Sequence, residues 1–374
     1  MTGELDRLRR FLPVLRYDSL GSFLADSPGV MTDRPGNLLK RADGTVQFGG
    51  QARPSLTLAG LGWPNYSDGT AARRSDHLDA VGKDYVVQAR EMHRGDYADR
   101  IHGRAVPADD GGWWLQYWFF YLYNNKSFLG FGLHEGDWEM VQIRLGADDA
   151  PVAMAFAQHT HGQRCGWDMV ERRGDRPVVY VARGSQASYA TPGRHSAPVV
   201  PDYADGKGRE VAGAILVDVG SQPPAWIHWQ GRWGSSRARS KLESNSPRGP
   251  AHQDKWSHPG TFFAESDEIR RRRGPEPPVP GPAPPAISAR REGGHAVISY
   301  RLAIEPQLPE PVVLVVSVDS EGDDLPPATE SHPVEGPEGE VQHSLTLDDG
   351  PYVVRVSAAD ESGNTSAPVV ARLD

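Results

Sequence analysis

One run of aromatic and apolar side chains, residues 113–123 (WWLQYWFFYLY), constrains the fold more than any other segment. It follows the turn signal Asp110-Gly111-Gly112 and contains neither glycine nor proline. Bulky rings lose rotamer freedom on a helix and pack well on a pleated sheet. The run therefore predicts a central strand buried on both faces, with Gln116 needing a buried partner. A stacking platform for a sugar or a base is the alternative, and core packing is favoured.

Further strands are predicted where apolar residues recur between turn signals. Three such runs in the first part of the chain cover residues 152–159, 177–183 and 212–219, with long Gly-, Asp- and Pro-rich loops between them. Helix signals are few and no tandem repeat is present. The sequence therefore predicts an all-β protein whose first domain is a β-sandwich.

A proline-rich segment marks the clearest boundary. Residues 274–285 (GPEPPVPGPAPP) favour extended polyproline geometry, which cannot continue a sheet and acts as a semi-rigid spacer. Four short strand-like runs follow it and predict a small β-sandwich. We therefore expect a domain over 1–270, a linker over 271–285 and a second domain over 286–374. Few contacts are expected between them, so that the first domain folds alone.

Composition restricts the partners and the compartment. The formal net charge of −9 argues against nucleic acid as the main partner, because phosphate binding needs a basic face. Cys165 stands alone, so an intrachain disulfide is excluded. The charged N-terminus is followed by no apolar signal region, and no apolar run approaches the roughly 20 residues of a membrane-spanning helix. We expect a cytoplasmic protein without a transmembrane segment, although export by another route stays open.

The motif His134-Glu135-Gly136-Asp137-Trp138-Glu139 carries the clearest chemical signal. On a strand, Asp137 and Glu139 share the face of the apolar residues that follow at alternate positions. A buried carboxylate costs several kcal/mol unless a cation offsets it. One interpretation is a metal site of His134, Asp137 and Glu139. The alternative is a carboxylate pair that caps backbone amides and meets an arginine such as Arg144 or Arg183.

Two further groups are candidates for the site. His159 and His161 stand at the end of a predicted strand and are candidate metal ligands or proton-transfer groups. Arg183, Ser185 and Gln186 lie in a tight turn after a buried strand, where they are candidates for binding a phosphate or a carboxylate.

Three segments in order, residues 115–121, 136–141 and 180–189, resemble the Vps62 family. The opening residues 12–17 and the closing residues 245–250 fit as well, so the resemblance covers about residues 10–265. The family usually has a histidine where this chain has Gln186.

The motif is also similar, more distantly, to a heptad (GHRHDWE) of the NPP1-like necrosis-inducing proteins. There the first His, the Asp and the last Glu hold a divalent cation that helps to engage a glycosylated membrane lipid. These positions fall on His134, Asp137 and Glu139, and the second His of the heptad becomes Gly136. A further aspartate ligand of that family would fall near Lys126.

Residues 347–366 look like the closing hairpin of fibronectin type III or bacterial immunoglobulin-like modules, which implies an accessory or adhesive module.

These resemblances imply divalent-cation-assisted binding of a glycan or a lipid headgroup. Oxygen ligands with one imidazole favour Mg²⁺, Mn²⁺ or Ca²⁺. The alternative function is a metal-dependent hydrolase in which His159 or His161 serves as base to a metal-activated water. An Fe(II) oxygenase, which needs one of these histidines as a ligand, is a third class.

Overall fold

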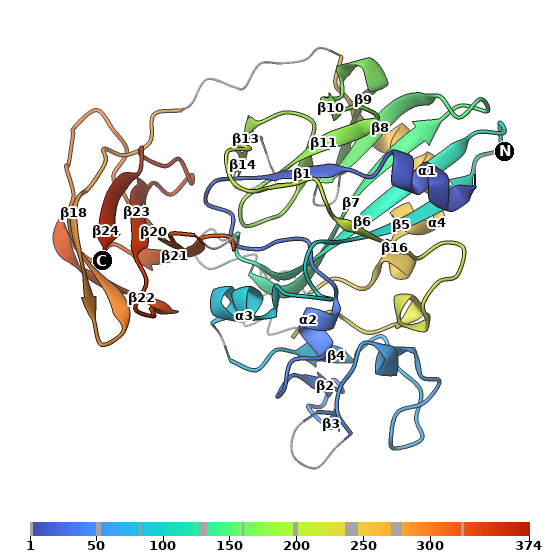
Figure 1. The fold of residues 1–374 in the computed structure, drawn as a ribbon, viewed down its shortest axis with the longest axis horizontal. Coiled ribbons are helices and arrows are strands. Elements are labelled where there is room, and N and C mark those ends of the chain that lie inside the picture. Colours follow the sequence, from blue (N-terminus) through green and yellow to red (C-terminus); the bar gives the residue numbers. More distant parts are fainter. Residues whose placement is uncertain are drawn as a thin grey trace.

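The computed structural model describes residues 3–49, 54–82, 84–126, 133–158, 161–196, 201–235, 246–270, 279–322 and 325–374. The protein is all-β, with short helices around its sheets (Figure 1). In the first domain the main sheet has the order β16-β5-β6-β7-β8-β9-β17, and a second sheet has the order β10-β11-β1-β15 with β12 paired to β11.

The strands of the main sheet are β5 (Arg100–Pro107), β6 (Trp113–Asn124), β7 (His134–Leu145), β8 (Pro151–Gln158), β9 (His161–Gly166), β16 (Ile215–Asp218) and β17 (Asp267–Glu268). Those of the second sheet are β1 (Val14–Tyr17), β10 (Arg172–Arg173), β11 (Arg176–Val181), β12 (Ser188–Tyr189) and β15 (Glu210–Val211). A hairpin joins β13 (Gly193–His195) to β14 (Asp202–Ala204), and a small sheet of order β3-β2-β4 contains β2 (Leu38–Lys40), β3 (Val46–Phe48) and β4 (His77–Asp79).

The α-helices are α1 (Glu4–Arg10), α2 (Gly29–Thr32), α3 (Tyr85–Met92), α4 (Asp254–Ser257) and α5 (Pro259–Glu265). The 3-10 helices are η1 (Ala59–Gly62), η2 (Trp167–Met169), η3 (Ala225–His228) and η4 (Pro250–His252). Within the described ranges, none of these helices is long and apolar enough to cross a membrane.

The aromatic run forms β6, in the middle of the main sheet between β5 and β7, as predicted. Trp118 and Phe120 pack on one face, against rings of the 225–265 segment, and Phe119 on the other, and all three are fully buried. Gln116 has the buried partner that the sequence predicts, because its amide nitrogen Nε2 donates to Gln142 Oε1 at 3.0 Å. These buried rings are core, so the stacking-platform interpretation of the run is wrong.

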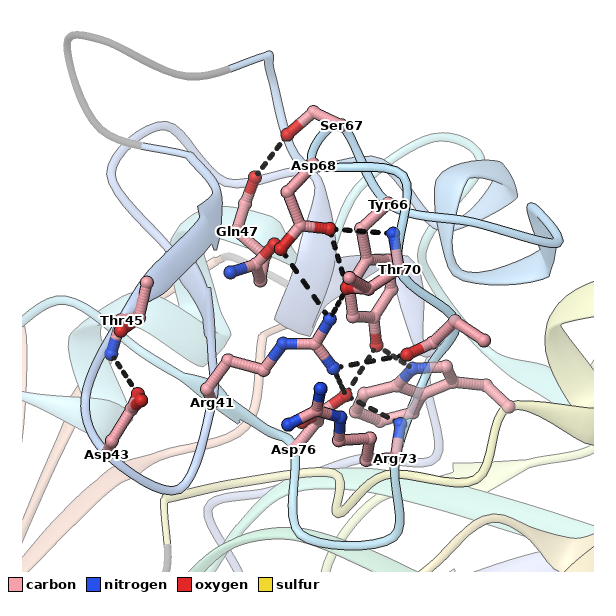
Figure 2. A network of polar contacts seen from close by, with 12 residues as sticks. Arg41, Asp43, Thr45, Gln47, Tyr66, Ser67, Asp68, Thr70, Arg73 and Asp76 are labelled. Atoms are coloured by element: carbon pink, nitrogen blue, oxygen red, sulfur yellow. Dashed lines mark hydrogen bonds and ion pairs between the residues drawn. The ribbon is translucent and has the colours of Figure 1, made fainter.

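A buried ion pair lies beside the small sheet of the first domain (Figure 2). Arg41 Nη1 donates to Asp76 Oδ2 at 2.8 Å, and the same oxygen accepts from the Tyr66 hydroxyl at 3.1 Å and from the Arg73 backbone N–H at 2.7 Å. Trp229 Nε1 in turn donates to the Tyr66 hydroxyl at 3.0 Å. These hydrogen bonds offset the cost of removing the ion pair from water. The pair therefore fixes the arrangement of the small sheet.

The C-terminal domain is a β-sandwich of two antiparallel sheets, with orders β18-β19-β22 and β21-β20-β23-β24. This is the strand order of a fibronectin type III module. Its apolar residues alternate inward, as the sandwich architecture requires. The strands are β18 (Ala286–Glu292), β19 (His295–Arg301), β20 (Val313–Ser320), β21 (Ala328–Pro333), β22 (Glu338–Thr346), β23 (Tyr352–Ala359) and β24 (Val369–Leu373).

The two domains meet through polar contacts between described residues. Figure 1 shows the C-terminal domain beside the first domain, with β21 next to α3. The Ser22 Oγ accepts from the Thr329 backbone N–H at 3.0 Å in a buried contact, and Arg90 donates to the Pro326 carbonyl. The Tyr203 hydroxyl donates to Asn364 Oδ1. The linker composition predicts a spacer, but complementary polar groups on the two domains bring them together.

Ser22→Ala tests this interface. The substitution leaves the buried Thr329 N–H without its acceptor, so we expect the free energy of unfolding to fall by about 2 kcal/mol. Urea denaturation of the full chain measures the change, and Ser362→Ala, at an exposed position of the same domain as Thr329, is the control. A Ser22→Ala protein as stable as the control would mean that the interface does not form in solution.

Candidate functional site

Two buried carboxylates lie on β7, where the alternation of the motif places them. Asp137 and Glu139 are opposite Tyr121 and Phe119 of β6 and are 7% and 6% exposed. Asp137 Oδ2 accepts from Asn124 Nδ2 at 3.0 Å, and its Oδ1 accepts from the Trp138 backbone N–H at 3.0 Å. Glu139 Oε2 is buried and has no hydrogen-bond partner among the described residues. A carboxylate oxygen in that state needs a proton or a cation.

A third carboxylate, Asp202 of β14, joins the pair from a distant part of the sequence. It is 1% exposed, and its Oδ1 accepts from Ser185 Oγ at 2.5 Å and from Lys126 Nζ at 2.8 Å. Its Oδ2 accepts from the Tyr189 hydroxyl at 2.6 Å. Sequence reasoning missed Asp202 because it stands in a polar stretch without a motif. We call Asp137, Glu139 and Asp202 the carboxylate cluster.

The electrostatics of the cluster favour an added positive charge. Burial raises the pKa of Glu139 well above its usual value, and the negative charges of Asp137 and Asp202 raise it further. The positive charge of Lys255 lowers the pKa, an effect weaker than that of burial or Asp137 and stronger than that of Asp202. Glu139 is therefore protonated over a wide pH range unless a cation approaches it.

Neither arginine that the sequence offered as a partner meets the carboxylates. Arg144 pairs with Asp110 at the other end of the strand. Arg183 donates through Nη2 to the Gly363 carbonyl of the C-terminal domain at 3.1 Å, and its guanidinium lies 4.5 Å from the centre of the Tyr203 ring. Asp137 accepts a backbone N–H, as that interpretation expects, but neither Arg144 nor Arg183 is its partner.

The histidines are placed apart from the carboxylates. His134, half-buried, keeps its Nδ1 3.0 Å from the carbonyl oxygen of Gly136, which accepts its N–H. The ligand atoms of His134, Asp137 and Glu139 do not form a group that lies within 4.8 Å. His161 is exposed at the start of β9, and His159 lies outside the described residues. A metal site that includes His134 stays a prediction.

The side chains of the 183–186 turn point to two different parts of the structure. Ser185 points to Asp202, as its 2.5 Å bond shows, whereas Arg183 points to the C-terminal domain. Gln186 has a left-handed backbone with φ of 53° and is 2% exposed. Its Oε1 is buried without a hydrogen-bond partner in the described part of the chain. The structure therefore does not bring Arg183 and Ser185 to one place, and anion binding by this turn stays a prediction.

Among the described residues, one His/Asp/Glu group does bring its ligand atoms within 4.8 Å, namely Asp26, His93 and Asp99. His93 Nδ1 lies 2.8 Å from Asp26 Oδ1. Arg209 donates to Asp99 Oδ2 at 2.8 Å, and its Nη1 lies 3.2 Å from His93 Nε2. The guanidinium thus already supplies the positive charge that a metal ion would bring. We interpret this group, which no sequence spacing announced, as an ion-pair network that joins four segments.

Two yeast proteins are similar to this chain in sequence over about half of its length. No family model matches the chain. The chain is 24% identical over 234 residues to vacuolar protein sorting-associated protein 62 of Saccharomyces cerevisiae, covering 51% of this chain and 47% of the relative. It is also 24% identical over 219 residues to vacuolar protein sorting-associated protein TDA6 of the same yeast, covering 45% of each.

A solved structure, NLPPya in complex with glucosamine, aligns with a TM-score of 0.32 and 12% identity over 50% of this chain and 74% of that chain. The chain spans about half the length of the curated relatives that it matches. Over that part, the protein is Vps62-like in sequence.

Proposed function

We propose that the first domain binds a polar ligand, a glycan or a lipid headgroup, with the help of a divalent cation held by Asp137 and Glu139. The observation that carries the proposal is the Glu139 Oε2 atom, which is buried beside Asp137 and has no hydrogen-bond partner among the described residues. A cation at this oxygen would replace the proton that burial otherwise imposes.

The balance of charge supports a cation at this place. The carboxylate cluster holds three buried acidic groups, whereas the described cations that act on it are Lys126, which is bound to Asp202, and Lys255, whose charge affects Glu139. Because carboxylate oxygens are hard ligands, Mg²⁺, Mn²⁺ or Ca²⁺ fits better than Zn²⁺. His134 is a third ligand by resemblance, but it stays bonded to the Gly136 carbonyl, so the proposal rests on the two carboxylates.

The surroundings support a polar ligand. Asn125, Lys126 and His134 are half-buried at the ends of β6 and β7, and Lys126 is bonded to Asp202. They offer amide, ammonium and imidazole groups, which match sugar hydroxyls and phosphate oxygens. A cation behind them would contribute open coordination positions to the same ligand.

Calorimetric titration of chelator-treated protein with Ca²⁺, Mn²⁺ and Mg²⁺ tests the cation. We expect one of these ions to bind and to raise the melting temperature, and we expect Glu139→Gln to weaken that binding by about 100-fold, because it removes the charge of one ligand. Glu135→Gln is the matched control. Glu135 is on the same strand and also buried, but its carboxylate already accepts from Ala80 N–H, Tyr85 OH and Ser235 N–H.

A screen of immobilised glycans and lipid headgroups, with and without EDTA, tests the ligand. Binding that EDTA and Glu139→Gln abolish, and that Glu135→Gln preserves, is the expected result. Ion binding that is equal in Glu139→Gln and wild-type protein would remove the carboxylates from the site. Ligand binding that persists in EDTA would show that the domain recognises the ligand without a cation.

A further inference from the structure

We propose that Arg74, Arg232 and Arg248 of the first domain form a site that binds a phosphate monoester, carried either by a small soluble molecule or by a lipid headgroup. We call these three residues the arginine group. Arg74 is exposed in the turn before β4, and Arg232 and Arg248 are half-buried, so a ligand can reach all three side chains. The site goes beyond the proposed function, because it requires no metal ion.

The backbone register places Arg232 and Arg248 opposite each other. Arg232 forms a parallel bridge with His77 of β4 and an antiparallel bridge with Arg248. The Trp233 N–H donates to the Pro247 carbonyl at 2.9 Å, so this hydrogen bond lies beside the arginine pair rather than within it. In pairs of this type the Cα atoms are about 4.5 Å apart and the side chains lie close together on one face. The two arginine side chains therefore project from the same face.

The arginine group concentrates positive charge. Burial lowers the pKa of Arg248, and the positive charges of Arg74 and Arg232 lower it further. Among the described residues, no carboxylate lies at ion-pair distance from any of the three, although the chain has 49 acidic residues against 40 lysines and arginines. Like charges directly opposite each other on neighbouring strands destabilise a fold. A bound anion would remove this repulsion.

The acidic residues around β4 are paired with other cations. Asp76 is fully buried and accepts from Arg41 Nη1 at 2.8 Å (Figure 2). Asp68 lies 3.8 Å from the same arginine, and Asp79 pairs with Lys40. These carboxylates are therefore directed at Arg41 and Lys40, and none of them meets the arginine group.

The structure holds Arg232 in a defined position. Its N–H donates to the Asp76 carbonyl at 2.8 Å, and its own carbonyl accepts from the Leu78 N–H at 3.0 Å. The side chain donates through Nη1 to the Ser246 carbonyl at 2.9 Å, which orients the guanidinium. Its other N–H groups have no acceptor in the described part of the chain. A ligand would therefore meet donors that are already in place, which lowers the entropic cost of binding.

A phosphate monoester matches the arginine group in charge and in shape. It carries a charge of about −1.5 to −2 at pH 7 and presents three strong acceptor oxygens. Each guanidinium can bind such oxygens through paired hydrogen bonds. A carboxylate has a single charge and only two oxygens, so it would satisfy fewer of the guanidinium groups. The formal net charge of −9 opposes a long polyanion and favours a single phosphate group.

Two measurements in metal-free buffer distinguish the sources of the phosphate. Calorimetric titration of the full chain with inorganic phosphate and with glucose 6-phosphate tests a soluble ligand. Sedimentation with phosphatidylcholine vesicles that contain phosphatidate tests a lipid. We expect a phosphate monoester to bind in at least one of the two. Acetate and vesicles that contain phosphatidylglycerol, which offer a carboxylate and a phosphodiester, should bind more weakly.

Substitutions identify the residues that bind. Arg74→Gln should weaken binding about tenfold and the Arg74→Gln/Arg248→Gln double variant about 100-fold, because each removes hydrogen bonds to a charged group. Neither side chain has a hydrogen-bond partner among the described residues, so both proteins should fold. Without ligand, their melting temperatures should equal or exceed that of the wild type, since repulsion is relieved. Arg9→Gln is the matched control, because it removes the same charge from exposed α1, which contacts β5 and β16.

Three results would overturn the proposal. The first is that neither the soluble phosphates nor the phosphatidate vesicles bind. The second is that the double variant keeps wild-type affinity. The third is that acetate and phosphatidylglycerol bind as well as the monoesters, which would show attraction by charge alone. Glu139→Gln should bind phosphate as the wild type does, because Glu139 is not part of the arginine group. Failure of this site and failure of the proposed cation site are therefore distinguishable.

Discussion

Gly136→Ala is expected to lower the free energy of unfolding by about 4 kcal/mol. Gly136 has φ of +60°, a conformation that costs other residues about 1–2 kcal/mol. A Cβ atom there would also lie 2.0 Å from the carbonyl oxygen of Trp233, so one of two buried backbone segments must move. Urea denaturation measures the loss. Gly174→Ala is the control, because its φ is +64° with nothing within 4 Å of the added carbon, and only the conformational cost applies.

Equal losses in the two variants would show that the Trp233 backbone does not pack on Gly136 in solution. The expected difference measures how closely the Trp233 carbonyl packs on Gly136. The glycine and the packing of Trp233 thus belong together.

The parts of the fold that local patterns determine were predictable. The aromatic run forms β6, which buries its central rings from Tyr117 to Tyr121. The C-terminal strands alternate apolar and polar residues between turns, and they form the expected sandwich. The small β3-β2-β4 sheet was missed because each of its strands is too short for alternation to show. Its buried Arg41–Asp76 pair joins residues that no spacing in the sequence relates.

The part of the candidate site that lies on one strand was predictable from the sequence. Alternation along one strand placed Asp137 and Glu139 on a shared buried face. Asp202 was not predictable, because it lies on the β13–β14 hairpin and no spacing in the sequence relates this hairpin to β7. Spacing also said nothing about the ring of His134, which the left-handed Gly136 lets bond to the Gly136 carbonyl. Strand periodicity fixes which face a residue occupies but not which distant residue meets it.

A clear pH effect is expected from His102. Its ring is 1% exposed and packs edge-on against Trp138 and Trp226 at centroid distances of 5.4 and 5.7 Å. Burial lowers its pKa from 6.5 to about 4. The unfolded chain therefore binds a proton more readily than the folded protein does between these two pH values. The stability that the neutral ring contributes is complete above pH 6.5 and is lost as the pH falls from 6.5 to 4.

A pKa difference of about 2.5 units corresponds to about 3 kcal/mol, since each unit is worth about 1.4 kcal/mol. Urea denaturation at pH 7 and pH 4 should therefore show wild-type protein losing about 3 kcal/mol more than His102→Gln. Glu139 acts with the opposite sign, because its raised pKa stabilises the folded state as the pH falls, but it does so in both proteins and cancels in the difference. His228→Gln, at an exposed position, should follow the wild type. If His102→Gln loses as much stability between pH 7 and pH 4 as the wild type does, protonation of a group other than His102 destabilises the protein at low pH.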